Sequence, residues 1–485
     1  MNTITLEFKP VKLKIPVEGL TLEALEEAIF DIRQEIGRTA FVTAIKDYDE
    51  QLAKQRPRGE LKNICFKTRY MQTRVGDIRY KRTLYKEKAT GKPRYLLDEA
   101  LKVGKNQRMS LKLAQIMDVL AASGPYRAAK DSLSKLLGIN LSHEALRQNV
   151  IREGKRLEEQ ETREHEKIKA LEYEMPKDIP EVVYTEADAT YIRRQNKGKK
   201  KSDRHLEVKA GIGYTGKEAR YAGGKRESKK LTRKMVYADI KAGRNEFLNR
   251  LSCIAEKTFG LSAVRKSYFG SDGDNWIKEG KEAYFGRAVY LLCSFHLFRN
   301  LRKALPGKKR SQQRLKKLFE TKQIDKVLTR LKRLIKAIRN RKAKAKLAEF
   351  RGYVKNNRQG IEASMNVRMD KNIESAGAIE PNIDKLIAQR FKGRGMSWSP
   401  DGAQALLKIR QAIINGQWDD WWYTKRGQTI QINAVFKEPL TAAQMNKRRK
   451  IAAFIEAELP CYRGPDQSKP WVGILQELTR ARQLS

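Results

Sequence analysis

The sequence predicts a mixed α/β protein whose central strands carry acidic residues. The first observation is an apolar strand over residues 181–194 that holds Glu186 and Asp188 in its middle. Because successive strand side chains point to opposite faces, these two carboxylates share one face. The second is an aromatic strand that runs into Asp272 and Asp274. Since burying unpaired charge is costly unless a cation compensates it, the two strands together predict a metal site.

Charge is the third observation. The chain of 485 residues has 102 Lys and Arg against 57 Asp and Glu, a net charge of +45. Such a basic surface indicates a polyanionic partner, and nucleic acid is the leading candidate. No apolar run approaches the roughly 18 residues of a membrane-spanning helix, and the N-terminus lacks the apolar core of a signal peptide. We therefore expect a cytoplasmic, nucleoid-associated protein without a membrane partner.

Residues 1–60 are predicted to form a helical region. A helix over residues 21–52 has an apolar stripe along one face, and Thr21 is in position to cap its N-terminus. This pattern favours a helix that docks on another surface or dimerises.

Residues 61–110 are predicted to contain a basic β-hairpin. Two strands over residues 64–85 flank a turn at Gly76 and Asp77. An ordinary solvated hairpin explains the pattern about as well as a DNA-binding one. On the DNA-binding interpretation, the side chains that hold a phosphate backbone are Arg69, Arg74 and Arg79.

A helix-turn-helix pattern lies within residues 111–175. One helix ends at Gly138, and Ser142 can cap the next. Any two short packed helices look similar, but the charge favours a DNA-reading pair. The side chains expected to face the major groove are His143, Arg147, Gln148 and Asn149. From residue 152 to residue 174 we expect a charged, solvated connector.

The core of the chain is predicted to comprise residues 178–300 and 372–412. The acidic strand is followed by a basic turn, in which Lys199 and Lys200 are candidate DNA contacts, and by an antiparallel strand. A helix over residues 244–258 then leads to the strand before Asp272, and a further strand leads to a helix with His296. Antiparallel strands followed by helix-linked parallel strands are the order of a ribonuclease H-like fold.

Residues 301–371 are predicted to be a basic helical insertion. Residues 301–350 hold 19 Lys and Arg against 3 Asp and Glu, while an apolar stripe keeps a helical period. A solvated helical hairpin is the alternative, but this block would repel itself without a polyanion. We expect it to clamp DNA through Lys332, Arg333, Lys336 and Arg339.

A further acid follows the insertion. A helix begins near Ile379 with Glu380 in its first turn, where Pro381 is tolerated because first-turn amides have no helical partner. Glu374 is the rival candidate in a less regular segment. In the C-terminal region, residues 413–485, three tryptophans could stack on DNA or lie in a core: Trp418, Trp421 and Trp422.

The segments "EADATYI", "SDGDNWI", "CSFHLFRNL" and "IEPNIDKLIAQRFKGRGMSWS" together resemble a known family. They are similar to the ISLre-type insertion-sequence transposases and, more distantly, to mutator-like transposases, which are DDE enzymes with a ribonuclease H-like core. The resemblance covers roughly residues 60–410. It implies Asp188, Asp272 and Glu380 as the first, second and third catalytic acids, with a helical insertion between the last two.

The resemblance also implies an activity. A DNA transposase would cleave and join the terminal repeats of its element and target DNA, as a homodimer or higher oligomer, with two Mg²⁺ or Mn²⁺ ions held by the three acids. Possible supporting residues are His296, Glu186 and Asp274. His296 could equally be a buried structural histidine. Two alternatives are a ribonuclease H-like nuclease that does not join DNA and a domesticated DNA-binding protein.

Overall fold

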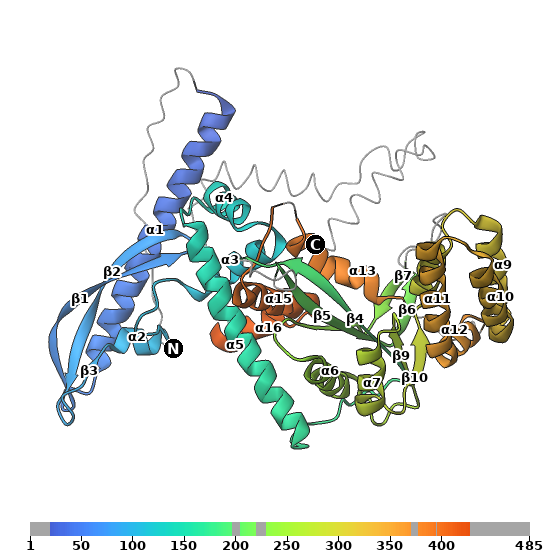
Figure 1. The fold of residues 1–485 in the computed structure, drawn as a ribbon. Coiled ribbons are helices and arrows are strands. Elements are labelled where there is room, and N and C mark those ends of the chain that lie inside the picture. Colours follow the sequence, from blue (N-terminus) through green and yellow to red (C-terminus); the bar gives the residue numbers. More distant parts are fainter. Residues whose placement is uncertain (1–19, 196–203, 220–228, 370–376, 394, 427–485) are drawn as a thin grey trace, which may run out of the picture. The chain divides into compact units, whose positions relative to one another are not determined.

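The computed structural model describes residues 20–195, 204–219, 229–369, 377–393 and 395–426, all within one compact unit that spans residues 1–426. The predicted C-terminal region beyond residue 426 and the first 19 residues lie outside these ranges. The described part is a mixed α/β protein with several sheets and many helices (Figure 1). Within it, no helix combines the length and the apolar character that crossing a membrane requires.

The largest sheet has five strands in the order β10–β9–β4–β5–β8. β5 runs antiparallel to β4, and β8 runs antiparallel to β5, whereas β9 and β10 continue the sheet parallel to β4. The strands are β4 (Val182–Arg193), β5 (His205–Tyr214), β8 (Met235–Asp239), β9 (Lys266–Ser271) and β10 (Val289–Leu292).

Helices make the connections that parallel strands require. α6 (Arg244–Phe259) joins β8 to β9, and α7 (Asn275–Tyr284) joins β9 to β10. The sequence predicted this alternation of strands and helices but missed β8. All five residues of β8 are buried, so the strand shows none of the alternation that marks a half-buried strand.

The two faces of this sheet bury different side chains. Val183 and Ala187 of β4 pack in one apolar cluster with residues of α6 and α7. Tyr184 packs in a second cluster on the opposite face. The two-residue period of a strand places Glu186 and Asp188 on the same face as Tyr184.

Two long helices pack closely on this second face. α5 (His143–Lys169) is one continuous helix, and our prediction of a solvated connector after residue 152 is wrong because Gly154 and Leu157 are buried. α5 contacts α15 (Pro400–Ile414). A Cβ at Gly154 would lie 2.4 Å from the Ala405 Cα, so only glycine allows this approach.

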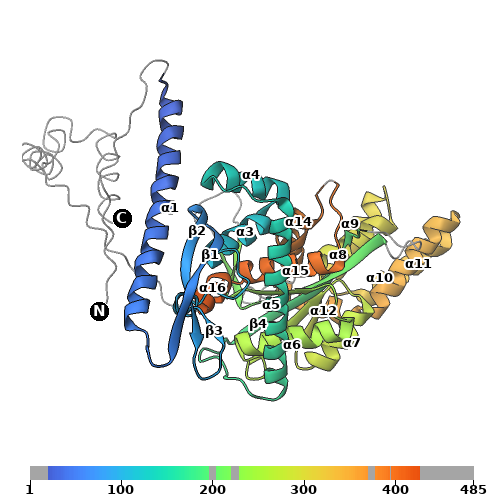
Figure 2. The ribbon, with the colours of Figure 1, turned by 90° about the vertical axis from the view of Figure 1, so that its left-hand side faces the viewer.

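The N-terminal part pairs a long helix with a hairpin. α1 (Leu22–Gln55) lies along the hairpin of β1 (Leu61–Thr73) and β2 (Gly76–Glu87) in both views (Figures 1 and 2). Thr73 pairs with Gly76, so the turn falls on residues 74–75 and not on Gly76 and Asp77 as predicted. β3 (Pro93–Arg94) and α2 (Leu96–Ala100) follow.

A local signal sets the start of α1, and a tertiary contact holds the helix near its other end. Thr21 accepts a hydrogen bond from the Ala24 backbone N–H at 3.2 Å, which caps the helix as predicted. Near the other end, buried Asp49 accepts hydrogen bonds from the backbone N–H and hydroxyl of Thr83 in β2. Part of the predicted apolar stripe remains exposed to solvent: the side chain of Ile29 is 47% exposed.

The helix-turn-helix pattern corresponds to α4 (Tyr126–Leu137) and the start of α5, packed with α3 (Leu111–Ser123). Ser142 caps α5 through the Ala145 backbone N–H, as predicted. Our prediction that Asn149 faces outward is wrong. Its side chain is 1% exposed and donates to Asp118 of α3 at 2.7 Å.

The basic segment forms helices with a core of their own. The set is α8 (Ser294–Ala304), α9 (Lys309–Glu320), α10 (Ile324–Ala337), α11 (Arg341–Asn356) and α12 (Arg358–Met369). Val327 and Leu331 of α10 are fully buried in this core. The basic side chains of the predicted clamp are exposed: Lys332, Arg333, Lys336 and Arg339.

The chain returns to the large sheet through α13 (Ile379–Ile383), η2 (Asp384–Ala388) and α14 (Gln389–Phe391). A small hairpin of β6 (Gly216–Ala219) and β7 (Lys229–Thr232) also lies within the described residues. In α16 (Trp418–Arg426), Trp418 and Trp422 are buried in the apolar cluster around α15, which favours the core interpretation of the tryptophans over DNA stacking.

Candidate metal centre

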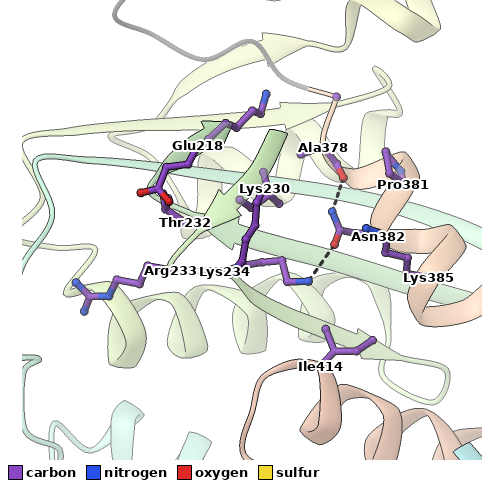
Figure 3. Close-up of a pocket in the computed structure, with 13 residues that line it drawn as sticks. Glu218, Lys230, Thr232, Arg233, Lys234, Ala378, Pro381, Asn382, Lys385 and Ile414 are labelled. Carbon is purple, nitrogen blue, oxygen red and sulfur yellow. Dashed lines mark hydrogen bonds between the residues drawn. The ribbon is translucent and has the colours of Figure 1, made fainter. Parts of the chain in front are cut away.

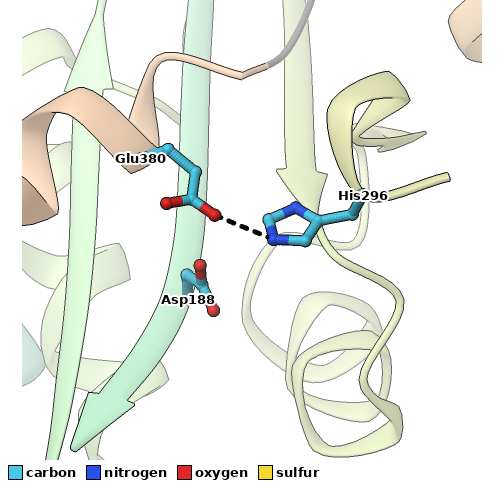
Figure 4. Close-up of side chains that lie close together, drawn as sticks. All are labelled: Asp188, His296 and Glu380. Carbon is cyan, nitrogen blue, oxygen red and sulfur yellow. Dashed lines mark ion pairs between the residues drawn. The ribbon is translucent and has the colours of Figure 1, made fainter. Parts of the chain in front are cut away.

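Three side chains from distant parts of the sequence meet beside β4. Asp188 of β4, His296 of α8 and Glu380 of α13 each offer one ligand atom, and these three atoms lie within 4.8 Å of one another. His296 Nε2 and Glu380 Oε1 are 2.9 Å apart (Figure 4). The spacing is suited to a shared cation, because each donor atom can reach a common point.

Burial, and then the positive charge of Arg299, lower the pKa of His296, while the charges of Asp272 and Glu380 oppose the shift. The net direction favours the neutral imidazole. The His296 side chain is 5% exposed, and the buried Nδ1 atom has no hydrogen-bond partner among the residues that the structure describes. The neutral ring is the form of histidine that binds metals.

Asp188 is in an unfavourable environment for a carboxylate. Burial, and then the negative charge of Asp272, raise its pKa to about 7, and Glu380 adds to the effect. One hydrogen bond to the ionised form, donated by the Ala189 backbone N–H at 2.7 Å, opposes the shift. A divalent cation among these acids would remove the repulsion that raises this pKa.

Asp272 comes to the same level of the sheet as Asp188. In the parallel pairing of β4 with β9, Glu186 lies opposite Gly270. Asp188 comes two residues after Glu186, and Asp272 comes two residues after Gly270. Asp272 Oδ1 accepts the Asp274 backbone N–H at 3.1 Å, and burial followed by the Asp274 charge raises the pKa of Asp272. In the structure Asp272 influences Asp188 by charge but is not a member of the three-residue group.

The backbone of Asp272 is fixed from the helical block. Tyr353 of α11 donates its hydroxyl hydrogen bond to the Asp272 carbonyl oxygen at 2.6 Å. Sequence analysis did not find Tyr353, and no local pattern marks it, because its role depends on a contact 81 residues away in the sequence. Asp274 is exposed and precedes α7.

Glu186 does not face the candidate metal centre as a free ligand. Its side chain is 2% exposed, and its two carboxylate oxygens accept the backbone N–H groups of Gly377, Ala378 and Ile379 at 2.9–3.1 Å. The Tyr214 hydroxyl donates a fourth hydrogen bond at 2.7 Å. We predicted Glu186 only as a possible supporting residue, and in the structure this carboxylate anchors the segment that carries Glu380.

The residues present fit a divalent cation. Two carboxylates and one imidazole supply oxygen and nitrogen donors, and burial together with the charge of Asp272 raises the pKa of Asp188. Carboxylates suit Mg²⁺ and Mn²⁺, whereas imidazole suits softer transition metals. Including His296 in the group therefore favours Mn²⁺ over Mg²⁺ relative to a purely carboxylate site.

The predicted DNA contacts divide into several groups. Arg69 is corrected, because it is 6% exposed and donates to Asp98 and to the carbonyl oxygens of Gly104 and Gln107. Arg147 and Gln148 remain near the surface but hydrogen-bond to Glu144. Arg74 and Arg79 are exposed. The predicted residues that lie outside the described ranges are Lys199, Lys200 and Glu374.

The fold and this centre define a class: a mixed α/β protein with acids from neighbouring parallel strands, a histidine and a glutamate converging at one sheet. The profile described as "Uncharacterised protein family (UPF0236)" matches residues 16–426. The chain belongs to this family.

Curated relatives carry the same family name. A UPF0236 protein of Caldanaerobacter subterraneus subsp. tengcongensis, whose name joins several identifiers of that strain, is 25% identical over 422 residues, covering 86% of this chain and 82% of the relative. The "UPF0236 protein in vanSb 3′region" of Streptococcus gallolyticus is 21% identical over 461 residues, covering 93% of this chain and 96% of the relative.

Among solved structures, the "Drosophila P element transposase strand transfer complex" is similar over 68% of this chain and 85% of its own, with 12% sequence identity and a TM-score of 0.23. A TM-score this low does not by itself indicate a shared fold.

Proposed function

We propose that the chain is a DNA transposase that cleaves and joins DNA strands at a ribonuclease H-like catalytic core. The observation that carries the proposal is the convergence of Asp188, His296 and Glu380, with Asp272 beside Asp188 at the neighbouring parallel strand. The strand order supports it, because three antiparallel strands followed by two helix-linked parallel strands are the arrangement expected of that fold. The sequence resemblance independently implies the same acids.

The chain's own residues have distinct roles in this proposal. Asp188, Glu380 and His296, with Asp272, would hold Mg²⁺ or Mn²⁺ ions. Two such ions supply activation of an attacking water or DNA 3′-hydroxyl and stabilisation of the leaving oxygen. Glu186 keeps Glu380 in place through the backbone of residues 377–379.

DNA is the proposed substrate because of charge. A chain of net charge +45 needs a polyanion, and the exposed Lys and Arg side chains of the hairpin and of α10 are available to phosphates. The name of the Caldanaerobacter relative joins several identifiers of one strain, which is the pattern that repeated copies of a gene produce. Repeated copies are consistent with a mobile element.

The test is incubation of the protein with Mn²⁺ or Mg²⁺ and duplex DNA that carries the genomic sequences flanking its gene. We expect strand cleavage and joined products from the wild type. Asp188→Ala, Asp272→Ala and Glu380→Ala should each lower cleavage by at least about 10³-fold, a typical loss for a catalytic group, with DNA binding retained. Cleavage by the wild type without joined products would make the protein a nuclease, and cleavage by Asp188→Ala would refute the site.

A further inference from the structure

A second pocket lies on the other side of the helix that carries Glu380. It has a volume of about 800 Å³ and lies between the β6–β7 hairpin and the α13–η2 helices, with the end of α15 at its edge (Figure 3). Its lining includes the described lysines Lys217, Lys230, Lys234 and Lys385, with Asn382 and Pro381 of α13.

Positive charge in this pocket exceeds negative charge. Lys234 is half-buried, and its ammonium donates to the Asn382 side-chain oxygen at 3.3 Å, a neutral partner. Burial lowers the pKa of Lys234, and the positive charges of Lys385 and Lys230 lower it further. Glu218 is the one carboxylate among the described lining residues, and it is exposed.

Arg233 does not contribute free positive charge. Although it is part of the lining, its guanidinium donates to Asp178 and to the Thr258 carbonyl oxygen. Lys230, Lys234 and Lys385 are thus the groups that an anionic ligand would meet. Bringing such ammonium groups together costs free energy unless an anion binds between them.

The pocket adjoins the candidate metal centre through the chain itself. Ala378, Pro381 and Asn382 line the pocket, while Glu380 between them points to the metal centre (Figure 4). A helix with its side chains is about 10–12 Å across, so one DNA strand that passes around α13 can reach both places.

We propose that this lysine pocket binds the backbone phosphates of a single-stranded stretch of the DNA that is cut beside Glu380. This inference rests on the proposed function. A volume of about 800 Å³ is that of a small-molecule site, which accommodates one or two nucleotides and excludes a duplex. Lysine ammonium groups bind phosphate as point charges, without the geometric demand of arginine.

The experiment measures binding of a labelled single-stranded oligodeoxynucleotide to the full chain in EDTA, where no cleavage interferes. Lys234→Gln/Lys385→Gln should weaken binding about tenfold at moderate salt and make the log–log salt slope about 1.4 shallower, because each single-strand phosphate contributes about 0.7. Because Lys234 is half-buried, Lys230→Gln/Lys385→Gln, which changes two exposed lysines, serves as a second variant. It should show a loss in the same direction.

Lys177→Gln/Lys266→Gln is the matched control, since it removes two exposed positive charges, one in the segment before β4 and one at the first residue of β9. It should bind as the wild type does. Equal affinity and slope for the wild type and both pocket variants would overturn the pocket proposal. Loss confined to duplex DNA would overturn its single-strand assignment.

The two proposals fail in different ways. If the pocket variants bind normally but the wild type still cleaves DNA in an Asp188-dependent reaction, only the pocket proposal is wrong. If the wild type binds neither single-stranded nor duplex DNA, the proposed function is wrong as well. If a free nucleoside monophosphate binds the pocket more tightly than the oligonucleotide does and displaces it, the pocket is a small-molecule site and the DNA assignment is overturned.

Discussion

At the scale of single residues, Asp188 should destabilise the metal-free protein at neutral pH. Its pKa is about 7 in the folded protein and about 3.9 in an unfolded chain, so the folded state disfavours its ionised form. The penalty is absent below about pH 4, grows as the pH rises to 7, and is complete above that. Asp188→Asn should therefore be more stable than the wild type at pH 8, by about 1.4 kcal/mol per pKa unit at most.

Thermal unfolding in EDTA at pH 4.5 and pH 8 measures this difference. The stability advantage of Asp188→Asn should shrink at the lower pH, and adding Mn²⁺ at pH 8 should raise the Tm of the wild type more than that of the variant. A variant that is less stable than the wild type at pH 8 without metal would contradict the electrostatic account.

Glu186 should matter to catalysis without touching the reacting atoms. In the wild type, the Glu186 carboxylate accepts hydrogen bonds from the backbone N–H groups of Gly377, Ala378 and Ile379. In Glu186→Gln, the side-chain NH₂ group replaces one of these acceptor oxygens with a donor. Leaving such buried donors unpaired costs about 1–3 kcal/mol. We expect lower stability, a lower cleavage rate and a higher Mn²⁺ concentration for half-maximal cleavage.

Tyr214→Phe is the matched control for Glu186, because it removes one hydrogen bond to the carboxylate and leaves the three backbone N–H donors in place. Its Mn²⁺ dependence should stay near that of the wild type. Wild-type metal dependence in Glu186→Gln would show that the position of Glu380 does not rely on this anchor.

At the scale of elements, the close packing of α5 against α15 depends on one missing side chain. In Gly154→Val the Cβ atom would overlap the Ala405 backbone, because it would lie 2.4 Å from the Ala405 Cα. The two helices would therefore have to separate. We expect a loss of about 3 kcal/mol or more in the free energy of unfolding, measured in urea. Gly352→Ala in α11 is the control: its added Cβ meets nothing within 4 Å, so stability should hold or rise.

The basic face of α10 separates a DNA clamp from a solvated helix. Replacing Lys332, Arg333 and Lys336 of α10, and Arg339 just after its end, with Gln keeps the helix propensity of α10 and leaves buried Val327 and Leu331 in place. A clamp predicts weaker binding to all duplex sequences and a salt slope shallower by about 0.9 per lost contact. Unchanged affinity at two salt concentrations would mean that these side chains only face water.

At the scale of the whole molecule, the net charge of +45 should dominate binding to DNA. The logarithm of the duplex affinity should fall linearly with the logarithm of salt concentration, with a slope of about −0.9 per phosphate contact. Fluorescence anisotropy across a salt series in EDTA measures that slope. A flat response would remove the argument that charge selects a nucleic-acid partner.

The sequence by itself predicted much of the order of elements, and it named Asp188, His296 and Glu380, which the structure brings close together. Thr21, Ser142 and Gly138 mark helix ends through hydrogen bonds and backbone angles confined to a few residues, so a local pattern is sufficient. Asp188 and Asp272 stand out because acids are rare in apolar strands. The short strand β8 was missed because a fully buried run has no alternation to detect.

Only the tertiary structure decided which charged groups are partners. Glu186 accepts hydrogen bonds from amides that lie almost two hundred residues later in the chain. Arg69 donates to Asp98, and His296 lies within 2.9 Å of Glu380. Each of these pairings joins elements that the fold brings together, and the free energy of a buried charge depends on what surrounds it in space. Sequence patterns report neighbours along the chain, and so they identify candidate groups but not their partners.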